Sequence, residues 1–218
     1  MLEVLTNPNR FFEARMKGEE SLKIPALIIL ISGIFGGIAA FLMVGVTLEV
    51  LGETIPPEAM GIASTIGGIS AFIGAVVGSF VIWVVFTALF FGISSIFKGE
   101  GKFKRTLEFV GYGYIPMIIG GVVSAIFMYH FVYYVFPTMS FPPVTDPAKT
   151  AEALKPLLKS STMLLSSVIG ILFMLWSANI WVFGLKHARN LSTKNALITV
   201  AIPVAAYILF LVYQMGVM

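Results

Sequence analysis

The amino-acid sequence predicts an all-α integral membrane protein: a bundle of five transmembrane helices with the N-terminus in the cytoplasm and the C-terminus outside. Hydrophobic residues make up 58% of the 218 residues and charged residues 11%, whereas soluble domains carry roughly a quarter charged residues. The apolar residues form five stretches of about 20, the length of helix that crosses roughly 30 Å of hydrocarbon. Most Lys and Arg residues lie between these stretches, on one predicted side of the membrane.

Residues 1–23 are predicted to form an amphipathic cytoplasmic arm. Glutamates are mixed with its basic residues and it has no apolar core, so it does not resemble a cleavable signal. Asn7 followed by Pro8 is typical of a helix start. The helix either lies along the inner headgroups or forms a short solvated arm. In the first case its interfacial anchors are Arg10, Phe11, Phe12 and Arg15.

The membrane domain is predicted over residues 24–218. Its five spans are residues 24–46, 70–97, 110–136, 162–185 and 196–215, which carry charged residues only where their edges meet a loop. The stretch GIASTIGGIS before the second span is a candidate for an additional partial helix. An external loop, residues 137–161, is predicted to carry a short helix that starts at Asp146 and Pro147. No alternation of period two favours a β-barrel.

The distribution of basic residues predicts the orientation. Of the 14 Lys and Arg residues, 11 lie in the segments predicted on the N-terminal side and 3 on the other side. The three on the other side are Lys149, Lys155 and Lys159. Since positively charged loops stay in the cytoplasm, the N-terminus is predicted inside, and an odd number of spans places the C-terminus outside.

Known catalytic patterns are missing from the sequence. There is no cysteine, and the motifs of metalloproteases, serine hydrolases and P-loop NTPases do not occur. His130 lies in an aromatic run near the outer end of the third span, where an interfacial position is favoured over a metal or proton site. The prediction is a non-enzymatic protein with no cofactor, no metal and no nucleic-acid partner.

The most unusual local features converge on the predicted cytoplasmic side. The run GYGYIP opens the third span, and aromatic and amide side chains follow on the fourth. Either these residues hold the helices together, with the Asn179 amide bonding a carbonyl freed by Pro116 or Pro203, or they form a shallow lipid or peptide site. The candidate site residues are Tyr112, Tyr114, Pro116, Trp176, Asn179 and Trp181.

Small residues recur at four-residue spacing in three spans, which lets helices approach closely. The sets are Gly33 and Gly37, then Ser70, Gly74 and Gly78, then Gly121 and Ala125. Such ridges pack helices of one chain or join two copies in a homodimer, and the sequence leaves both possibilities open.

Taken in order, several short motifs resemble the Yip family of multi-spanning membrane proteins, named for interaction with Ypt/Rab GTPases. The motifs are NPNRFF, five spans with a cytoplasmic N-terminus, GYGYIP, and a fourth span that ends in GLKHARNLSTKNA. The short arm before the first span is similar to prokaryotic members. The resemblance implies a membrane scaffold in trafficking or bilayer shaping. The family-pattern positions that carry it are Pro8, Phe11, Phe12, Gly111, Tyr112, Pro116, Gly184 and Leu185.

The predicted function is therefore a scaffold that recruits partners or shapes the bilayer. Its inner segments carry 11 basic and 6 acidic residues, a net charge of +5, which suits anionic lipid headgroups at about 1 kcal/mol per basic residue. The basic inner loop is represented by Lys102, Lys104 and Arg105. A transporter or permease for an uncharged or lipidic solute is the alternative.

Overall fold

The computed structural model describes residues 2–51, 56–141, 152 and 154–217. Throughout these residues the regular structure is helical, and five helices are long and apolar enough to cross a membrane. They are Lys23–Val50, Glu58–Ile96, Ile115–Thr138, Ser161–Ala188 and Thr193–Gln214. The all-α class and the five spans are thereby confirmed, while the orientation stays a prediction.

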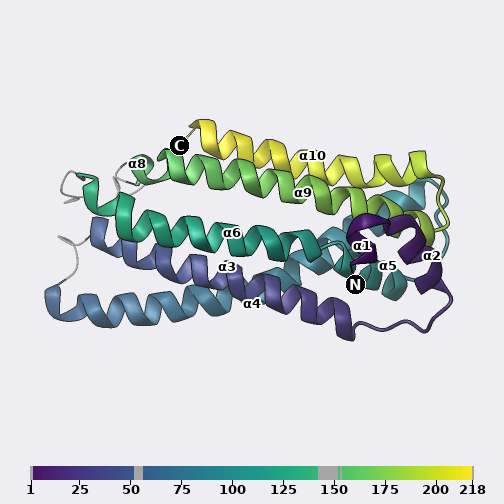
Figure 1. Ribbon diagram of the computed structural model, residues 1–218, viewed down its shortest axis with the longest axis horizontal. Helices are drawn as coiled ribbons and strands as arrows, with labels where there is room; N and C mark the ends of the chain where they lie inside the picture. Colours follow the sequence, from purple (N-terminus) through teal and green to yellow (C-terminus); the bar gives the residue numbers. More distant parts are fainter. Residues whose placement is uncertain (1, 52–55, 142–151, 153, 218) are drawn as a thin grey trace.

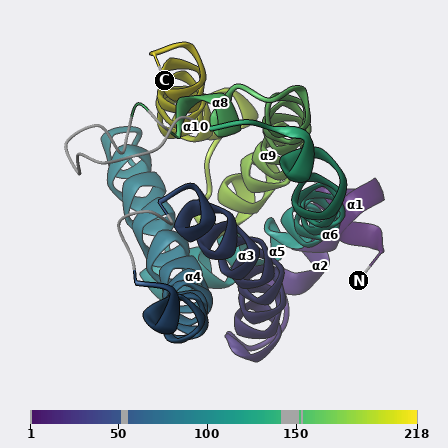
Figure 2. The same cartoon turned by 90° about the vertical axis from the view of Figure 1, so that its left-hand side faces the viewer.

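The five spans run lengthwise in alternating directions, and the chain begins and ends at opposite ends of the bundle (Figure 1). The helices are α3 (Lys23–Val50), α4 (Pro57–Ile96), α6 (Ile115–His130), α9 (Ser161–Ala188) and α10 (Thr193–Val217). Figure 2 shows α9 between α6 and α10, with α3 and α4 completing the bundle.

Helix α4 begins well before residue 70, where the second span was predicted to start, and the run GIASTIGGIS is part of this one helix. Ser64 and Thr65 donate hydrogen bonds to the carbonyl of Gly61, at 3.1 and 2.9 Å. Their hydroxyls are therefore satisfied within the helix and do not interrupt it.

One end of the bundle, here called the basic end, is covered by three short helices (Figure 1). They are α1 (Glu3–Thr6), α2 (Pro8–Met16) and α5 (Phe103–Tyr112). Residues 97–102, between α4 and α5, and residues 189–192, between α9 and α10, also lie there. The 11 basic residues predicted to be cytoplasmic belong to these elements or to the adjoining helix ends: Arg10, Arg15, Lys17, Lys23, Lys98, Lys102, Lys104, Arg105, Lys186, Arg189 and Lys194.

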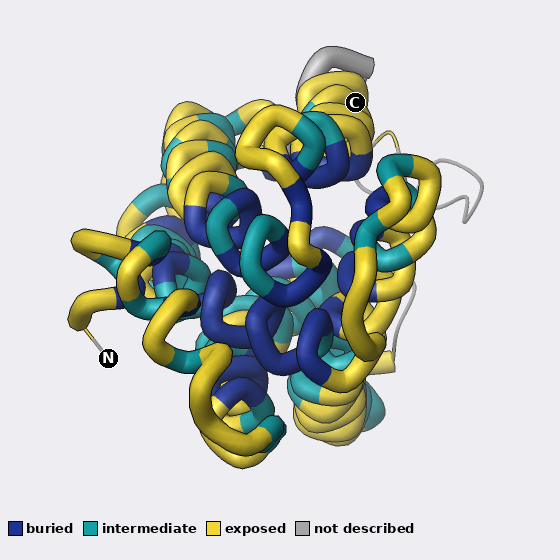
Figure 3. The backbone as a smooth tube through the Cα atoms, turned by 90° about the vertical axis from the view of Figure 1, so that its right-hand side faces the viewer, coloured by how far each residue is buried: buried dark blue, intermediate teal, exposed yellow. Residues whose placement is uncertain are grey.

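The basic end holds the larger of the two hydrophobic cores formed by the described residues. Figure 3 looks onto this end and shows buried backbone at its centre, with exposed faces around it. The core includes the fully buried Phe12, Phe90, Phe109 and Ile180. Side chains from the arm, from α4, from α5 and from α9 thus share one interior, which makes this end a single packed unit.

The opposite end holds the smaller core, which includes the fully buried Phe131 and Leu157. A π-helical turn (Phe131–Val135) and a 3-10 turn (Phe136–Thr138) extend α6, and α8 (Lys155–Leu158) precedes α9. His130 stacks on Tyr134 with ring centroids 5.4 Å apart. The predicted helix start at Asp146 and Pro147 lies outside the described residues.

Two of the small-residue ridges pack helices within the chain. A Cβ on Gly37 would lie 2.6 Å from the Phe72 ring, and one on Gly121 would lie 2.9 Å from Phe35. Glycine is needed there because the neighbouring helix approaches closely. Gly74 on α4 differs, since a Cβ there would meet no atom within 4 Å.

Candidate functional site at the basic end

Helix α5 is a short amphipathic helix at the basic end, and it sits where the sequence predicted a basic loop. It begins at Phe103 and ends at Tyr112, after which Gly113 and Tyr114 connect it to α6. Pro116 lies near the start of α6 and has no N–H. In a continuous helix its ring would clash with the carbonyl four residues earlier, so α5 and α6 form two separate helices. The turn lays α5 against α3, α4 and α9.

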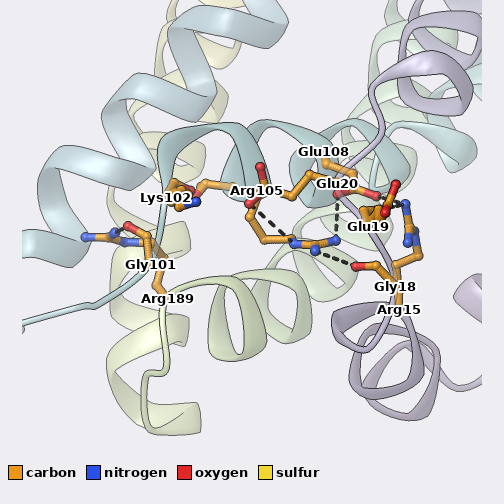
Figure 4. A network of polar contacts seen from close by, with 10 residues as sticks. Arg15, Gly18, Glu19, Glu20, Gly101, Lys102, Arg105, Glu108 and Arg189 are labelled. Carbon is orange, nitrogen blue, oxygen red and sulfur yellow. Dashed lines mark hydrogen bonds and ion pairs between the residues drawn. The ribbon is translucent and has the colours of Figure 1, made fainter.

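The Glu108 carboxylate on α5 is fully buried and is held by two arginines (Figure 4). Arg105, one turn earlier, donates from Nη1 to Glu108 Oε2 at 2.9 Å. Arg15, from the N-terminal arm, places Nη2 2.5 Å from Glu108 Oε1. The carboxylate thus joins the arm to α5 in the interior of the basic end.

The same arginines also hold the segment between α2 and α3. Arg105 Nη2 donates to the carbonyl of Gly18 at 2.7 Å, and its Nε lies 3.9 Å from Glu20 Oε1. Arg15 Nη2 donates to the carbonyl of Glu19 at 2.7 Å. Figure 4 shows these groups converging on α5. This connection is therefore fastened to the bundle by its backbone carbonyls.

Burial raises the pKa of the Glu108 carboxyl above 4.5, and the positive charges of Arg15 and Arg105 oppose part of that rise. Removing a buried ion from water is costly, and a counter-ion with good hydrogen-bond geometry offsets that cost. Glu108 is thus tolerated in the core only with its arginines in place.

A second network surrounds the buried guanidinium of Arg189, which follows α9. Its Nε donates to Ser94 Oγ at 2.9 Å, and its two Nη atoms donate to the carbonyls of Gly101 and Gly99, each at 2.6 Å. The guanidinium also lies over the Phe91 ring, 3.9 Å from its centroid. One side chain therefore joins the α9–α10 connection to the end of α4 and to the α4–α5 connection.

The N-terminal arm is part of this folded end. Asn9 Oδ1 accepts a hydrogen bond from Lys186 Nζ at 3.1 Å and lies 3.0 Å from His187 Nε2. Phe12 is fully buried, with its ring centroid 4.7 Å from that of Phe109. The arm thus packs on the bundle through Phe12, while Met16 of the same helix is exposed.

Two tryptophans hold α5 against the spans. Trp83 Nε1 donates to the carbonyl of Leu107 at 3.0 Å, and Trp181 Nε1 donates to that of Val110 at 2.8 Å. The indole of Trp181 lies directly over Gly113, so closely that a Cβ at this position would overlap the ring. The glycine in GYGYIP makes room for this tryptophan.

Replacement of Gly113 by alanine is expected to lower the free energy of unfolding by about 1–3 kcal/mol, because the added methyl displaces the indole and strains its hydrogen bond. Gly92→Ala is the matched control, since a Cβ on Gly92 would meet no atom within 4 Å. Chemical unfolding in detergent micelles compares the two. A Gly113→Ala variant as stable as Gly92→Ala would contradict the described packing.

The six residues predicted to form a cytoplasmic-side site do not line one cleft. Tyr112, Tyr114 and Trp181 are buried in the larger core, where the rings of Tyr114 and Trp181 lie 5.2 Å apart. Pro116 is also buried, whereas Trp176 is exposed on α9.

Asn179 lines a separate groove of about 500 Å³ between α9 and α10. Its side chain has no hydrogen bond to any described residue, so the predicted bond to a carbonyl freed by Pro116 or Pro203 is not formed there.

The predicted anchor and loop residues divide between surface and interior. Arg10 is exposed and pairs with Glu3 at 3.4 Å, and Phe11 packs edge-on against Phe12. Lys102 and Lys104 are exposed, as expected of a basic surface. Arg105 and Arg15 instead belong to the buried network.

The sequence prediction missed Glu108 and the role of Arg189. Arg105 and Glu108 are three residues apart and lie beside apolar residues. This spacing favours a helix on which the two charged side chains pair with each other on the buried face. Arg189 has no comparable local signal, because its acceptors lie about 90 residues earlier in the chain. Among the described residues, no group of His, Asp or Glu is suited to hold a metal ion.

Comparison with known proteins places this architecture in a family. The Yip1 domain model matches residues 2–214, which include the arm, the basic end and the five spans. An uncharacterized protein of Methanocaldococcus jannaschii, MJ0794, is 37% identical over 133 residues, 60% of this chain and 89% of that protein. No solved structure matches the chain.

These findings confirm the resemblance noted in the sequence, and the archaeal relative is consistent with a short prokaryotic-type member. They give no support to the transporter alternative and no indication of catalysis. The chain is a multi-pass integral membrane protein and belongs to the Yip1 domain family.

Proposed function

We propose that this protein is a non-enzymatic membrane scaffold whose basic end binds anionic lipid headgroups and presents a rigid platform to a protein partner. The observation that carries the proposal is that the charged residues at this end divide into a buried set and an exposed basic set. Glu108, Arg105 and Arg189 are buried and paired, and they fix the shape of the platform. Seven of the remaining basic side chains at this end are exposed, whereas Arg15 is bound to Glu108 and Lys186 is half-buried against Asn9.

The exposed basic residues at this end are Arg10, Lys17, Lys23, Lys98, Lys102, Lys104 and Lys194. Each contributes about 1 kcal/mol of attraction near an anionic membrane surface. Because the platform is built from several elements joined by buried hydrogen bonds, these charges keep a fixed arrangement, which favours selective recruitment over diffuse attraction.

The double variant Lys102→Gln/Lys104→Gln is expected to lose much of the preference for anionic lipid, about fivefold for each lysine removed. The measurement is electron spin resonance in nanodiscs, comparing the motionally restricted fractions of spin-labelled phosphatidylglycerol and phosphatidylcholine.

Lys155→Gln/Lys159→Gln is the matched control, because these two exposed lysines lie at the opposite end. Equal lipid selectivity in wild type and both variants would overturn the lipid part of the proposal.

A further inference from the structure

A second cavity lies inside the bundle, in the half away from the basic end. It has a volume of about 390 Å³ and is bounded by α6, α9 and α10. Tyr207 on α10 lines it and packs edge-on against Phe86 of α4, with ring centroids 6.0 Å apart. Since Tyr207 reaches across toward α4, the cavity faces the interior of the bundle. Two of its lining residues, Met117 and Met174, also pack in the larger core, so the cavity adjoins that core.

Polar side chains without partners line this cavity. Ser124, Ser166, Tyr207 and Gln214 have no side-chain hydrogen bond to any described residue. Several other hydroxyls in the spans bond their own helix, as Thr87 does by donating to the carbonyl of Trp83 at 2.8 Å, although the buried hydroxyl of Ser177 on α9 also has no partner. An unsatisfied polar group in hydrocarbon is costly, so groups left free around one cavity indicate a ligand with hydrogen-bonding capacity.

Ser167 also lines the cavity, but its hydroxyl donates to the carbonyl of Met163 at 3.0 Å. The other described lining residues are apolar, and none of the described lining residues is charged. Along α9, Ser166, Gly170 and Met174 lie on one helix face at four-residue spacing. Ser177 and Trp181 continue that face and are buried, so the cavity closes at the level of Met174. Ser166 and Gln214 lie near the ends of α9 and α10 that face away from the basic end. The apolar part of the cavity lining lies closer to the middle of the bundle.

We propose that this cavity binds an uncharged, hydroxyl-bearing lipid, with its head at Ser124, Ser166 and Gln214 and its alkyl chain against Met174. No basic group is found among the described lining residues, which disfavours a phosphate headgroup because it would be buried without a counter-charge. The volume lies within the range of small-molecule sites, roughly 300–1,000 Å³. This site is separate from the proposed headgroup platform, and either proposal stands if the other fails.

Gly170 offers a direct test, because it lines the cavity and a Cβ there would meet no atom within 4 Å. Gly170→Leu therefore fills the cavity without a clash at the first atom of the new side chain. Gly74→Leu is the matched control: that glycine also faces open space, but it is exposed on α4.

The experiment is photolabelling of the full chain in nanodiscs with a monoacylglycerol that carries a diazirine on its chain, followed by peptide mapping. A lysophosphatidic acid with the same chain is the anionic comparison. The expected result is labelling of α9 and α10 beside the cavity by the neutral probe, reduced about tenfold in Gly170→Leu and unchanged in Gly74→Leu.

Three results would overturn the proposal: equal labelling in both glycine variants, equal labelling by the anionic probe, or labelling spread evenly over the lipid-facing helices. If Gly170→Leu does not reconstitute, the double variant Ser166→Ala/Gln214→Leu takes its place. It removes the polar groups at nearly constant volume, and the same outcomes decide.

Discussion

Replacement of Arg105 by methionine is expected to lower the free energy of unfolding by about 3–5 kcal/mol at neutral pH, the usual cost of breaking a buried ion pair from one side. The variant keeps an apolar stem over Phe109, where the guanidinium carbon now lies 5.5 Å from the ring centroid. It removes the bonds to Glu108 and to the carbonyl of Gly18. Lys104→Met, at an exposed neighbour, is expected to change stability by less than about 0.5 kcal/mol.

The stability that Arg105→Met loses is expected to depend on pH, and the direction of that dependence follows from the pKa of Glu108. Burial already holds the pKa of Glu108 above 4.5 in the folded protein, and removal of Arg105 raises it further. A carboxyl with a raised folded-state pKa stabilises the fold below its unfolded pKa, and this contribution is lost as the pH rises through the folded-state value. The deficit of Arg105→Met is therefore largest at neutral pH and shrinks as the pH falls toward 4.5.

A second substitution separates the buried charge from a mere packing defect. Adding Glu108→Gln to Arg105→Met removes the uncompensated carboxylate, and most of the lost stability is expected to return at neutral pH. Unfolding in mixed detergent micelles at several pH values provides the measurement. A deficit that neither acid nor Glu108→Gln reduces would show that Arg105 acts through packing alone.

Replacement of Arg189 by methionine is expected to have an effect of similar size, about 3–5 kcal/mol. The carbonyls of Gly99 and Gly101 and the hydroxyl of Ser94 lose their donor. Each buried polar group left without a partner costs about 1–3 kcal/mol. Gly101 has a φ of +107°, and its conformation aims the carbonyl at Arg189.

The comparison between Arg189→Lys and Lys194→Met tests whether the planar shape of the Arg189 guanidinium, and not only its charge, stabilises this end. A lysine keeps the positive charge but not the planar fork that reaches several acceptors, so Arg189→Lys is expected to recover less than half of the loss. Lys194 is an exposed basic residue on the same end, and Lys194→Met is expected to be close to neutral. Full stability in Arg189→Lys would mean that charge alone holds the two connections together.

The spans could be predicted from the sequence because hydrocarbon imposes a length on every helix that crosses it. Lys23–Val50 and Ser161–Ala188 contain the predicted stretches 24–46 and 162–185. The start of α4 was harder to locate, since Gly67, Ser64 and Thr65 reduce the local hydropathy without breaking the helix. Their polar groups are satisfied by bonds that hydropathy does not register.

The basic end could be predicted only in part. The apolar face of the arm is visible in the spacing of Phe12 and its neighbours, but a single helix does not reveal whether lipid or protein covers that face. In the structure Phe109 packs against Phe12, while Met16 is exposed. Tyr114 and Trp181, which were predicted as site residues, are buried in the larger core, and their position depends on the turn that lays α5 across the spans.

The proposed platform requires that the basic end and α8 face opposite sides of the membrane, with the basic end in the cytoplasm. The chain has no cysteine, so single cysteines at the exposed positions of Lys102, Lys194 and Lys155 can be labelled with a membrane-impermeant maleimide. In intact cells only Lys155→Cys is expected to react, and Lys102→Cys and Lys194→Cys are expected to react after permeabilisation. Reaction of Lys102→Cys and Lys155→Cys from the same side would contradict the five-span topology and the platform built on it.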